Sequence, residues 1–230
     1  MPTKIAYSLE DAKPLTLGKE ESDFKIFGKR IITKMIGEFN VYNMLAAANF
    51  AKSQNISPEI IKRALEKFQG VPGRMEKVEI DLDEIKGEEN KNRLIRKFPP
   101  FTVIVDYAHT ADSLEKVYKV FRDENKICIL GSTGGGRDKW KRPLMGAVAE
   151  KYCQKIILTN EDPYDDDPEE IIRDVASGIK KSKIQIILDR RLAIKNALES
   201  AKAGDVVLVT GKGTDPFIMG ANGVKEPWSD

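Results

Sequence analysis

Short apolar runs alternate with amphipathic segments over most of the chain. The runs at 101–105 and 206–210 hold β-prone residues throughout, and the run at 101–105 precedes a helix-period face formed by Leu114, Val117, Tyr118 and Phe121. Runs that are apolar throughout are typical of strands buried on both faces of a sheet. Further predicted strands are 75–80, 127–130, 155–158 and 184–188. The pattern predicts an α/β fold with a Rossmann-like, mostly parallel sheet and helices on both faces.

The residues before position 74 have a different pattern. Residues 25–32 alternate around Gly28, which predicts a hairpin, and residues 40–53 are alanine-rich and predicted helical. Ser57 and Pro58 begin a second predicted helix. Its expected apolar face is Ile60, Ile61, Ala64, Leu65 and Phe68. Pro72 and Gly73 interrupt regular secondary structure, so we predict a boundary between two domains, 1–73 and 74–230. Within the second domain, residues 81–100 are a charged insertion.

Composition narrows the function classes. The chain has 38 basic and 36 acidic residues, a net charge of +2, which gives no chain-wide argument for nucleic acid binding. No apolar run approaches the ~20 residues of a membrane span. Cys128 and Cys153 form no spaced cluster, so we expect plain core residues and no disulfide or zinc. His109 is the single histidine, which excludes a His-rich metal site and mechanisms that need two imidazoles. We name no metal-ligating residue, and we expect a cytoplasmic protein.

A glycine cluster follows the predicted strand at 127–130. Cations come next at Arg137, Lys139, Lys141 and Arg142, ahead of a predicted helix with Leu144, Met145, Val148, Ala149 and Tyr152 on its apolar face. A glycine-rich loop at a helix N-terminus, with cations beside it, suits an anionic small molecule. The alternative is a surface loop whose charges are solvated.

Polar residues or glycines follow four of the predicted strands. These segments are 106–110, 131–139, 159–164 and 211–215. Ligands of parallel sheets bind beyond the carboxyl ends of the strands. We therefore predict a ligand site along this edge. The alternative is that these segments are surface loops whose polar residues have no role in binding.

Six motifs then carry a resemblance to a known family. They are Gly-Glu-Phe-Asn-Val-Tyr-Asn at 37–43, Gly-Arg-Met-Glu at 73–76, Asp-Tyr-Ala-His-Thr at 106–110, Gly-Gly-Arg-Asp-Lys at 135–139 with Lys-Arg-Pro at 141–143, Asp162-Pro163, and Gly-Lys-Gly at 211–213. In order and spacing, from about residue 25 to the end, they resemble the Mur ligases. The closest resemblance is to members that add the third residue of the peptidoglycan stem peptide to a UDP-N-acetylmuramoyl-dipeptide.

The resemblance implies an ATP-dependent, Mg²⁺-using ligase that works through an acyl phosphate. By resemblance, Asn40 and Asn43 would face the adenine, and Asp106 would hold the ribose. Arg74 would be the catalytic residue and bind a phosphate, with a linker salt bridge as the alternative. His109 would lie at the nucleotide, and it could equally orient its own loop.

The resemblance also implies an amino-acid site. Arg137 would bind the α-carboxylate of the incoming diamino acid, near Asp138, Glu161, Asp162, Tyr164, Lys212 and Asp215. Diaminopimelate-adding members carry an arginine where this chain has Tyr164, and the usual His-Glu is here Thr214-Asp215. Carboxylates without that arginine suit a side-chain ammonium, so we expect lysine to be favoured over meso-diaminopimelate.

The family's UDP-sugar domain, phosphate loop and carbamylated lysine have no counterpart in these 230 residues, which contain no Gly-x-x-x-x-Gly-Lys-Ser/Thr. We therefore expect a fragment, formed by the tail of a central ATPase domain and a C-terminal ligase domain, that does not turn over ATP alone. The alternative is a non-catalytic module that binds a nucleotide or a partner. A Rossmann dehydrogenase is disfavoured, because the glycines after 130 lack the Gly-x-Gly-x-x-Gly spacing.

Overall fold

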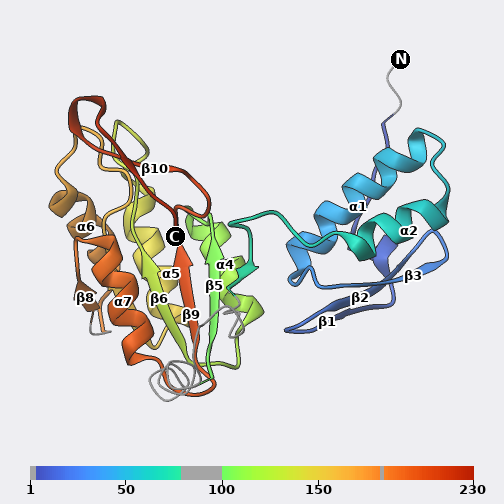
Figure 1. Cartoon of the computed structure of the whole chain (residues 1–230), viewed down its shortest axis with the longest axis horizontal. Coiled ribbons are helices and arrows are strands. Elements are labelled where there is room, and N and C mark those ends of the chain that lie inside the picture. The colour runs from blue at the N-terminus through green and yellow to red at the C-terminus, as the bar shows by residue number, and fades with distance from the viewer. Residues whose placement is uncertain (1–3, 79–99, 182–183) are drawn as a thin grey trace, which may run out of the picture. The chain divides into compact units, whose positions relative to one another are not determined.

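The computed structural model describes residues 4–78, 100–181 and 184–230. The chain divides into two compact units, residues 1–71 and 72–230, each described by itself (Figure 1). Most of the predicted charged insertion at 81–100 lies outside the described residues. No helix in the ranges just given is long and apolar enough to cross a membrane.

The first unit contains a three-stranded antiparallel sheet in the order β1 (Leu15–Leu17), β2 (Ser22–Ile26), β3 (Lys29–Thr33). A short 3-10 helix, η1 (Leu9–Ala12), precedes it. Ile26 pairs with Lys29 across the turn at Phe27 and Gly28. This register confirms the hairpin predicted around Gly28.

Helices α1 (Glu38–Ser53) and α2 (Pro58–Lys67) complete the core of the first unit. Phe24 and Ile31 of the sheet pack with Val41, Leu45 and Ile61 of the helices. The predicted apolar face of α2 is only partly right, because two of its five members are exposed, Ile60 at 49% and Phe68 at 44%.

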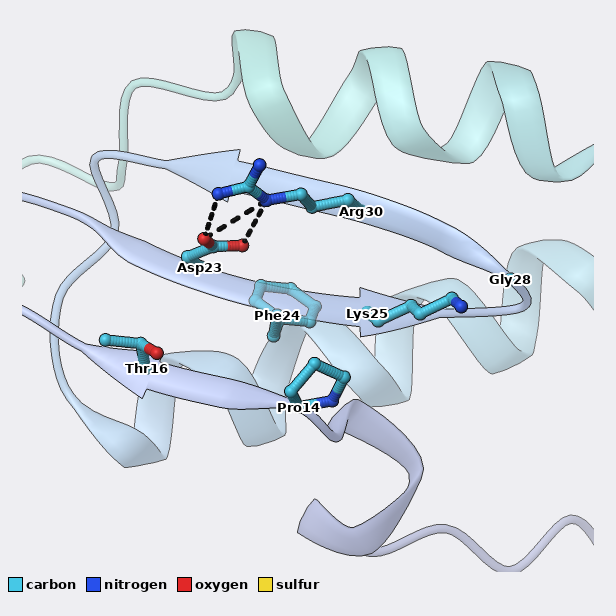
Figure 2. A pocket seen from close by; sticks show the side chains of 7 residues that line it. All are labelled: Pro14, Thr16, Asp23, Phe24, Lys25, Gly28 and Arg30. Atoms are coloured by element: carbon cyan, nitrogen blue, oxygen red, sulfur yellow. Dashed lines mark hydrogen bonds and ion pairs between the residues drawn. The ribbon is translucent and has the colours of Figure 1, made fainter.

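A cavity of about 510 Å³ lies on the sheet of the first unit and is open to solvent (Figure 2). Its lining residues are Pro14, Thr16, Asp23, Phe24, Lys25, Gly28 and Arg30. The Arg30 guanidinium holds Asp23 at 2.6 Å, and this ion pair lowers the pKa of Asp23. Arg30 is exposed, so the pair contributes little to stability.

The second unit is built on a six-stranded sheet in the order β4-β5-β9-β6-β7-β8. The strands are β4 (Glu76–Lys77), β5 (Thr102–Asp106), β6 (Lys126–Leu130), β7 (Lys155–Leu158), β8 (Ile184–Ile186) and β9 (Val206–Thr210). All neighbours are parallel except β4 and β5. The predicted α/β fold with a mostly parallel sheet is confirmed.

Helices cover both faces of this sheet. Helix α7 (Arg190–Ser200) packs through Ala193 and Ala197 on a face that includes Ile127 and Ile129 of β6. Alternate residues of a strand point to opposite faces, so Cys128 and Leu130 face the other side. That side is covered by α4 (Ala111–Val120), α5 (Lys141–Tyr152) and α6 (Pro168–Ala176), and Figure 1 shows α5 and α7 on opposite sides.

Local signals explain several of these boundaries. The Asp167 side chain accepts a hydrogen bond from Glu169 N, and Pro168 is the first helical residue, so α6 begins where the sequence predicts. Strand β8 is shorter than the predicted 184–188. On α5, Leu144 is 48% exposed, so its assignment to the apolar face was wrong.

Cys128 and Cys153 form a disulfide bond, with their Cα atoms 6.1 Å apart. The prediction that they are unlinked core residues was wrong. They are 25 residues apart in the sequence and meet because α5 returns along β6 and ends beside it. Because the bond exists, cysteine usage gives no argument for a reducing compartment.

The last elements are β10 (Phe217–Met219), a 3-10 turn η2 (Ala221–Gly223) and β11 (Lys225–Pro227). Strands β10 and β11 pair antiparallel, and Met219 lies opposite Lys225. Figure 1 shows this segment, in dark red, running across the end of the sheet at which β9 ends.

Candidate functional site

A cavity of about 250 Å³ lies at the carboxyl ends of β5, β6, β7 and β9. It is lined by Tyr107, His109, Thr133, Arg137, Lys141, Glu161, Asp162, Tyr164, Gly211 and Asp215. Each of the four strand ends therefore contributes, as expected for ligand sites of parallel sheets. The prediction that four distant segments meet at one edge is confirmed.

The glycines after β6 bring two loops together. A Cβ on Gly134 would lie 2.1 Å from the Pro163 carbonyl oxygen, and a Cβ on Gly135 would lie 2.9 Å from the Tyr164 ring. Gly134 N also donates to Asp162 O at 2.7 Å. The absence of a side chain at Gly134 and Gly135 thus lets this loop pack against the loop after β7. A Cβ on Gly136 would meet no neighbouring atom.

Two of the cavity's carboxylates share one buried lysine. Lys212 Nζ lies 2.8 Å from both oxygens of Asp162 and 3.1 Å from Asp215 Oδ2. Met219 N donates to Asp162 Oδ1 at 2.8 Å. Lys212 is buried and is not part of the cavity lining, so its role is to hold Asp162 and Asp215 in place.

Glu161 is the third acid and is almost fully buried. Its Oε1 accepts a hydrogen bond from Thr133 Oγ1 at 2.9 Å, and its Oε2 has no hydrogen-bond partner within the described chain. Burial raises the pKa of Glu161, and the charge of Arg190 and the Thr133 hydrogen bond oppose the rise only in part. Glu161 is therefore poorly suited to carry a full negative charge.

The cavity also contains cationic groups. Arg137 is exposed, and Lys141 Nζ donates to the His109 carbonyl at 3.2 Å. The Nδ1 of His109 lies 2.8 Å from the Tyr107 carbonyl, and because a carbonyl oxygen only accepts, Nδ1 donates this hydrogen bond. This bond supports the interpretation of His109 as a residue that orients its own loop.

Arg74 and Asp106 lie next to this cavity without lining it. The Arg74 guanidinium lies over the Tyr107 ring, 4.2 Å from its centroid. Asp106 accepts from Met75 N at 2.8 Å and from Ala108 N at 2.7 Å. Burial raises the pKa of Asp106. These bonds tie the segment that carries Arg74 to the end of β5.

Asp138, Asn40 and Asn43 are the remaining predicted residues. Asp138 is exposed and does not line it. Asn40 and Asn43 belong to the first unit: Asn40 is buried and donates to Ile36 O at 2.8 Å, and Asn43 is exposed on α1. Their predicted contact with adenine stays a prediction.

Metal ligands do not gather in the part of the chain that the structure describes. No group of three or more His, Cys, Asp or Glu side chains there is arranged to hold an ion. Of the three carboxylates that line the cavity, Asp162 and Asp215 already pair with the Lys212 ammonium, and burial raises the pKa of Glu161, so these side chains are poor ligands for Mg²⁺.

Several cavity residues had no role assigned from the sequence. Thr133 and Tyr107 belong to this group, and both follow a strand at the predicted edge, which was the available signal. Arg190 gave no such signal, because it begins a helix and its charge reaches Glu161 only in the folded chain.

Residues 92–213 match the family described as Mur ligase, glutamate ligase domain. The chain belongs to the Mur ligase family. Its homologues are ligases of the MurE type, and the match covers their C-terminal portion.

Individual Mur ligases give the extent of the similarity. The chain is 44% identical over 201 residues to the UDP-N-acetylmuramoyl-L-alanyl-D-glutamate--2,6-diaminopimelate ligase of Aquifex aeolicus (strain VF5), covering 86% of this chain and 38% of that ligase. The enzyme of the same name from Syntrophomonas wolfei is 42% identical over 190 residues, covering 80% of this chain and 35% of the relative. A solved structure of a ligase of that name has a TM-score of 0.59 at 30% identity, covering 95% of this chain and 42% of the other. The chain thus spans about two fifths of these relatives.

The expectation of lysine over diaminopimelate is not supported. The relatives are named for 2,6-diaminopimelate. The physical premise also fails, because Asp162 and Asp215 already share the Lys212 ammonium and burial raises the pKa of Glu161. Of these three acids, Asp215 is the most exposed, at 32%, so the described cavity offers one accessible carboxylate and not the cluster on which the preference for lysine rested.

Proposed function

We propose that this chain supplies the amino-acid-binding part of an ATP-dependent ligase. That ligase would join a diamino acid to UDP-N-acetylmuramoyl-L-alanyl-D-glutamate in peptidoglycan synthesis. The observation that supports the proposal is the cavity at the carboxyl edge, which brings Arg137 and Lys141 together with Asp215. A guanidinium binds a carboxylate through two parallel hydrogen bonds, and a carboxylate accepts from an ammonium, so this set suits an amino acid.

The diamino acid that the relatives' names favour is 2,6-diaminopimelate. In this proposal Arg137 holds the α-carboxylate. The Tyr164 hydroxyl donates to the second carboxylate, where an arginine would otherwise be expected. Asp215, which shares Lys212 with Asp162, accepts from an amino group of the substrate.

The reaction forms an amide in two steps. The carboxylate of the nucleotide-linked peptide attacks the γ-phosphorus of ATP, which gives an acyl phosphate and ADP. The neutral amine of the diamino acid then attacks the acyl carbon, and inorganic phosphate leaves. In the first step the Arg74 guanidinium stabilises the charge on the transferring phosphoryl group. Asn40 and Asn43 contact the adenine, Asp106 the ribose, and His109 orients its loop beside the nucleotide. We assign no Mg²⁺ ligand to this chain.

A segment exchange tests the proposal. The part of the Aquifex aeolicus ligase that aligns with this chain is replaced by the chain itself, and formation of the UDP-linked tripeptide is measured with diaminopimelate and with lysine. We expect product with diaminopimelate and a lower kcat/KM with lysine. Arg137→Met should raise KM for diaminopimelate at least tenfold, because it removes a charge-assisted bidentate contact.

A matched control separates this role from charge alone. Arg173→Met removes an exposed arginine of α6 whose partners are Asp167 and Glu169, and it should leave the kinetics unchanged. A folded chimera that binds nucleotide but forms no tripeptide would favour the non-catalytic module instead. We also expect that the 230-residue polypeptide alone releases no phosphate from ATP, and phosphate release abolished by Arg74→Ala would contradict that expectation.

A further inference from the structure

Arg190 and Asp230 form a buried ion pair, and neither residue lines the cavity. Arg190 Nε donates to Asp230 Oδ1 at 2.7 Å, and Nη2 donates to Oδ2 at 2.6 Å. Nη2 also donates to the Thr210 carbonyl, at the end of β9, at 2.9 Å. Both side chains are 0% exposed. A buried, forked pair of this kind opens rarely, because separating it leaves two desolvated charges.

Asp230 is the last residue of a segment that we call the strap, residues 216–230. Within the strap, β10 pairs with β11, and Trp228 N donates to Pro216 O at 2.9 Å. The Trp228 indole donates to Asp230 Oδ1 at 2.8 Å. The strap is therefore a paired hairpin, so a displacement of one strand is passed to the other.

The other strand of the hairpin contacts the loop after β7. Met219 N donates to Asp162 Oδ1 at 2.8 Å, and Met219 O accepts from Tyr164 N at 3.0 Å. Asn222 N donates to Asp165 Oδ1 at 2.7 Å. The strap thus bridges α7 and the loop that carries Asp162 and Tyr164.

We propose that Arg190 is a positioning residue for the cavity. By fixing Asp230 against the end of β9, it holds the hairpin where Met219 keeps Asp162 on Lys212 and fixes the backbone of Tyr164. Arg190 itself touches no ligand in this proposal. Its effect on the affinity for an amino acid rests on the proposed function, whereas its effect on the strap does not.

Asp230→Asn tests the proposal in the 230-residue chain. The variant keeps the size of the side chain and a hydrogen-bond acceptor, but it loses the charge and presents an NH₂ group to Arg190. We expect the amide resonances of Met219 and Tyr164 to move, and both amides to lose protection from hydrogen exchange. In a Trp140→Phe background, where Trp228 is the single tryptophan, its emission should shift to longer wavelength.

Arg191→Met is the matched control. Arg191 is the next residue, and its guanidinium lies over the Trp228 ring at 5.2 Å. The change should alter Trp228 emission without moving the Met219 or Tyr164 resonances. If Asp230→Asn changes only residues 228–230, the proposal is overturned. If Asp230→Asn fails to fold, Arg190→Lys is measured in the same way. This variant keeps the charge but cannot make two parallel hydrogen bonds to Asp230, so it must shift the Met219 and Tyr164 amide resonances.

An affinity measurement in the chimera separates the two proposals. Asp230→Asn should raise KM for diaminopimelate several-fold while kcat stays within twofold. An unchanged KM together with shifted Met219 and Tyr164 resonances would count against the proposed function, because the cavity would have changed without effect on the amino acid. Unchanged resonances would count against the role of Arg190 itself.

Discussion

Lys212 and Asp162 join the ends of two strands that are not neighbours. Lys212 follows β9 and Asp162 follows β7, and β6 lies between these strands in the sheet. The ammonium nitrogen is 2.8 Å from both carboxylate oxygens, and the Lys212 side chain is 1% exposed. The pair therefore fixes the two loops that contribute Tyr164 and Asp215 to the cavity.

Replacement of Lys212 by methionine should destabilise the second unit strongly. The change leaves Asp162 and Asp215 without their common cation, and breaking a buried pair on one side costs about 3 kcal/mol. Urea unfolding followed by circular dichroism measures the loss. Lys151→Met is the control, because Lys151 is 65% exposed and its bond to Glu115 is long, at 3.3 Å. The control should leave stability almost unchanged, and equal losses for the two variants would contradict the prediction.

Gly134 and Gly136 should respond differently to alanine. A Cβ on Gly134 would lie 2.1 Å from the Pro163 carbonyl oxygen. This oxygen belongs to the main chain and cannot turn aside as a side chain can, so the loops after β6 and β7 must separate. A Cβ on Gly136 would have no atom within 4 Å, so the loss of stability in Gly136→Ala comes from the backbone angle φ of +76° alone. We expect about 1 kcal/mol for Gly136→Ala and about 2–3 kcal/mol for Gly134→Ala.

The two glycine variants should also differ at the cavity. Only Gly134→Ala should shift the Asp162 and Tyr164 amide resonances, because its neighbours belong to their loop. Identical spectra for the two variants, at equal stability, would show that the Gly134 contact does not position the loop.

The central strands of the sheet were predictable because they are almost entirely apolar. Ile127, Ile129 and Val207 are buried against α7, and this burial requires the unbroken apolar runs that the sequence contains. The burial of individual helix residues was less predictable. Leu144 and Ile60 have helical spacing from buried residues but lie at the margin of their helix faces, where spacing alone does not decide exposure.

The order of strands and polar segments in the sequence predicted which segments form the cavity. It did not predict which side chains of these segments pair with one another. Asp162 and Asp215 looked like free acids in the sequence, and only folding brings the Lys212 ammonium between them. The same limit applies to Cys128 and Cys153 and to Arg190 and Asp230. For Lys212 and Asp162, as for these two pairs, the partners are 25 or more residues apart and no periodicity relates them.

The disulfide should contribute measurably to stability. It closes a loop across a sequence separation of 25 residues, which in the chain-entropy model corresponds to about 3.5 kcal/mol. We expect no free thiol in the denatured, unreduced chain, because the structure contains no free cysteine in its described ranges. A Cys128→Ala/Cys153→Ala double variant should unfold at lower urea. Two titratable thiols in the unreduced chain would contradict the bond.

Two glutamates should give opposite dependence of stability on pH. Tyr152, Lys119 and Lys151 lower the pKa of Glu115 to about 2 through hydrogen bonds. Glu115 therefore stabilises the fold above the pKa of the unfolded chain, and its contribution is lost as the pH falls. Glu115→Gln should cost stability at neutral pH and little in acid, which urea unfolding at both conditions would measure. An equal cost at both would contradict the assignment.

Glu161 should behave in the opposite way, because burial raises its pKa above the ordinary 4.5. Between the unfolded and the folded pKa, the native chain binds more protons than the unfolded chain, so stability falls as the pH rises through this range. Glu161→Gln cannot ionise, and its amide resembles the protonated acid. The variant should therefore lose less stability than the parent chain when urea unfolding is repeated from about pH 4.5 to about pH 8. Part of the decline should remain in both proteins, because burial also raises the pKa of Asp106. Parallel stability curves for the two chains would show that Glu161 is not held in its protonated form.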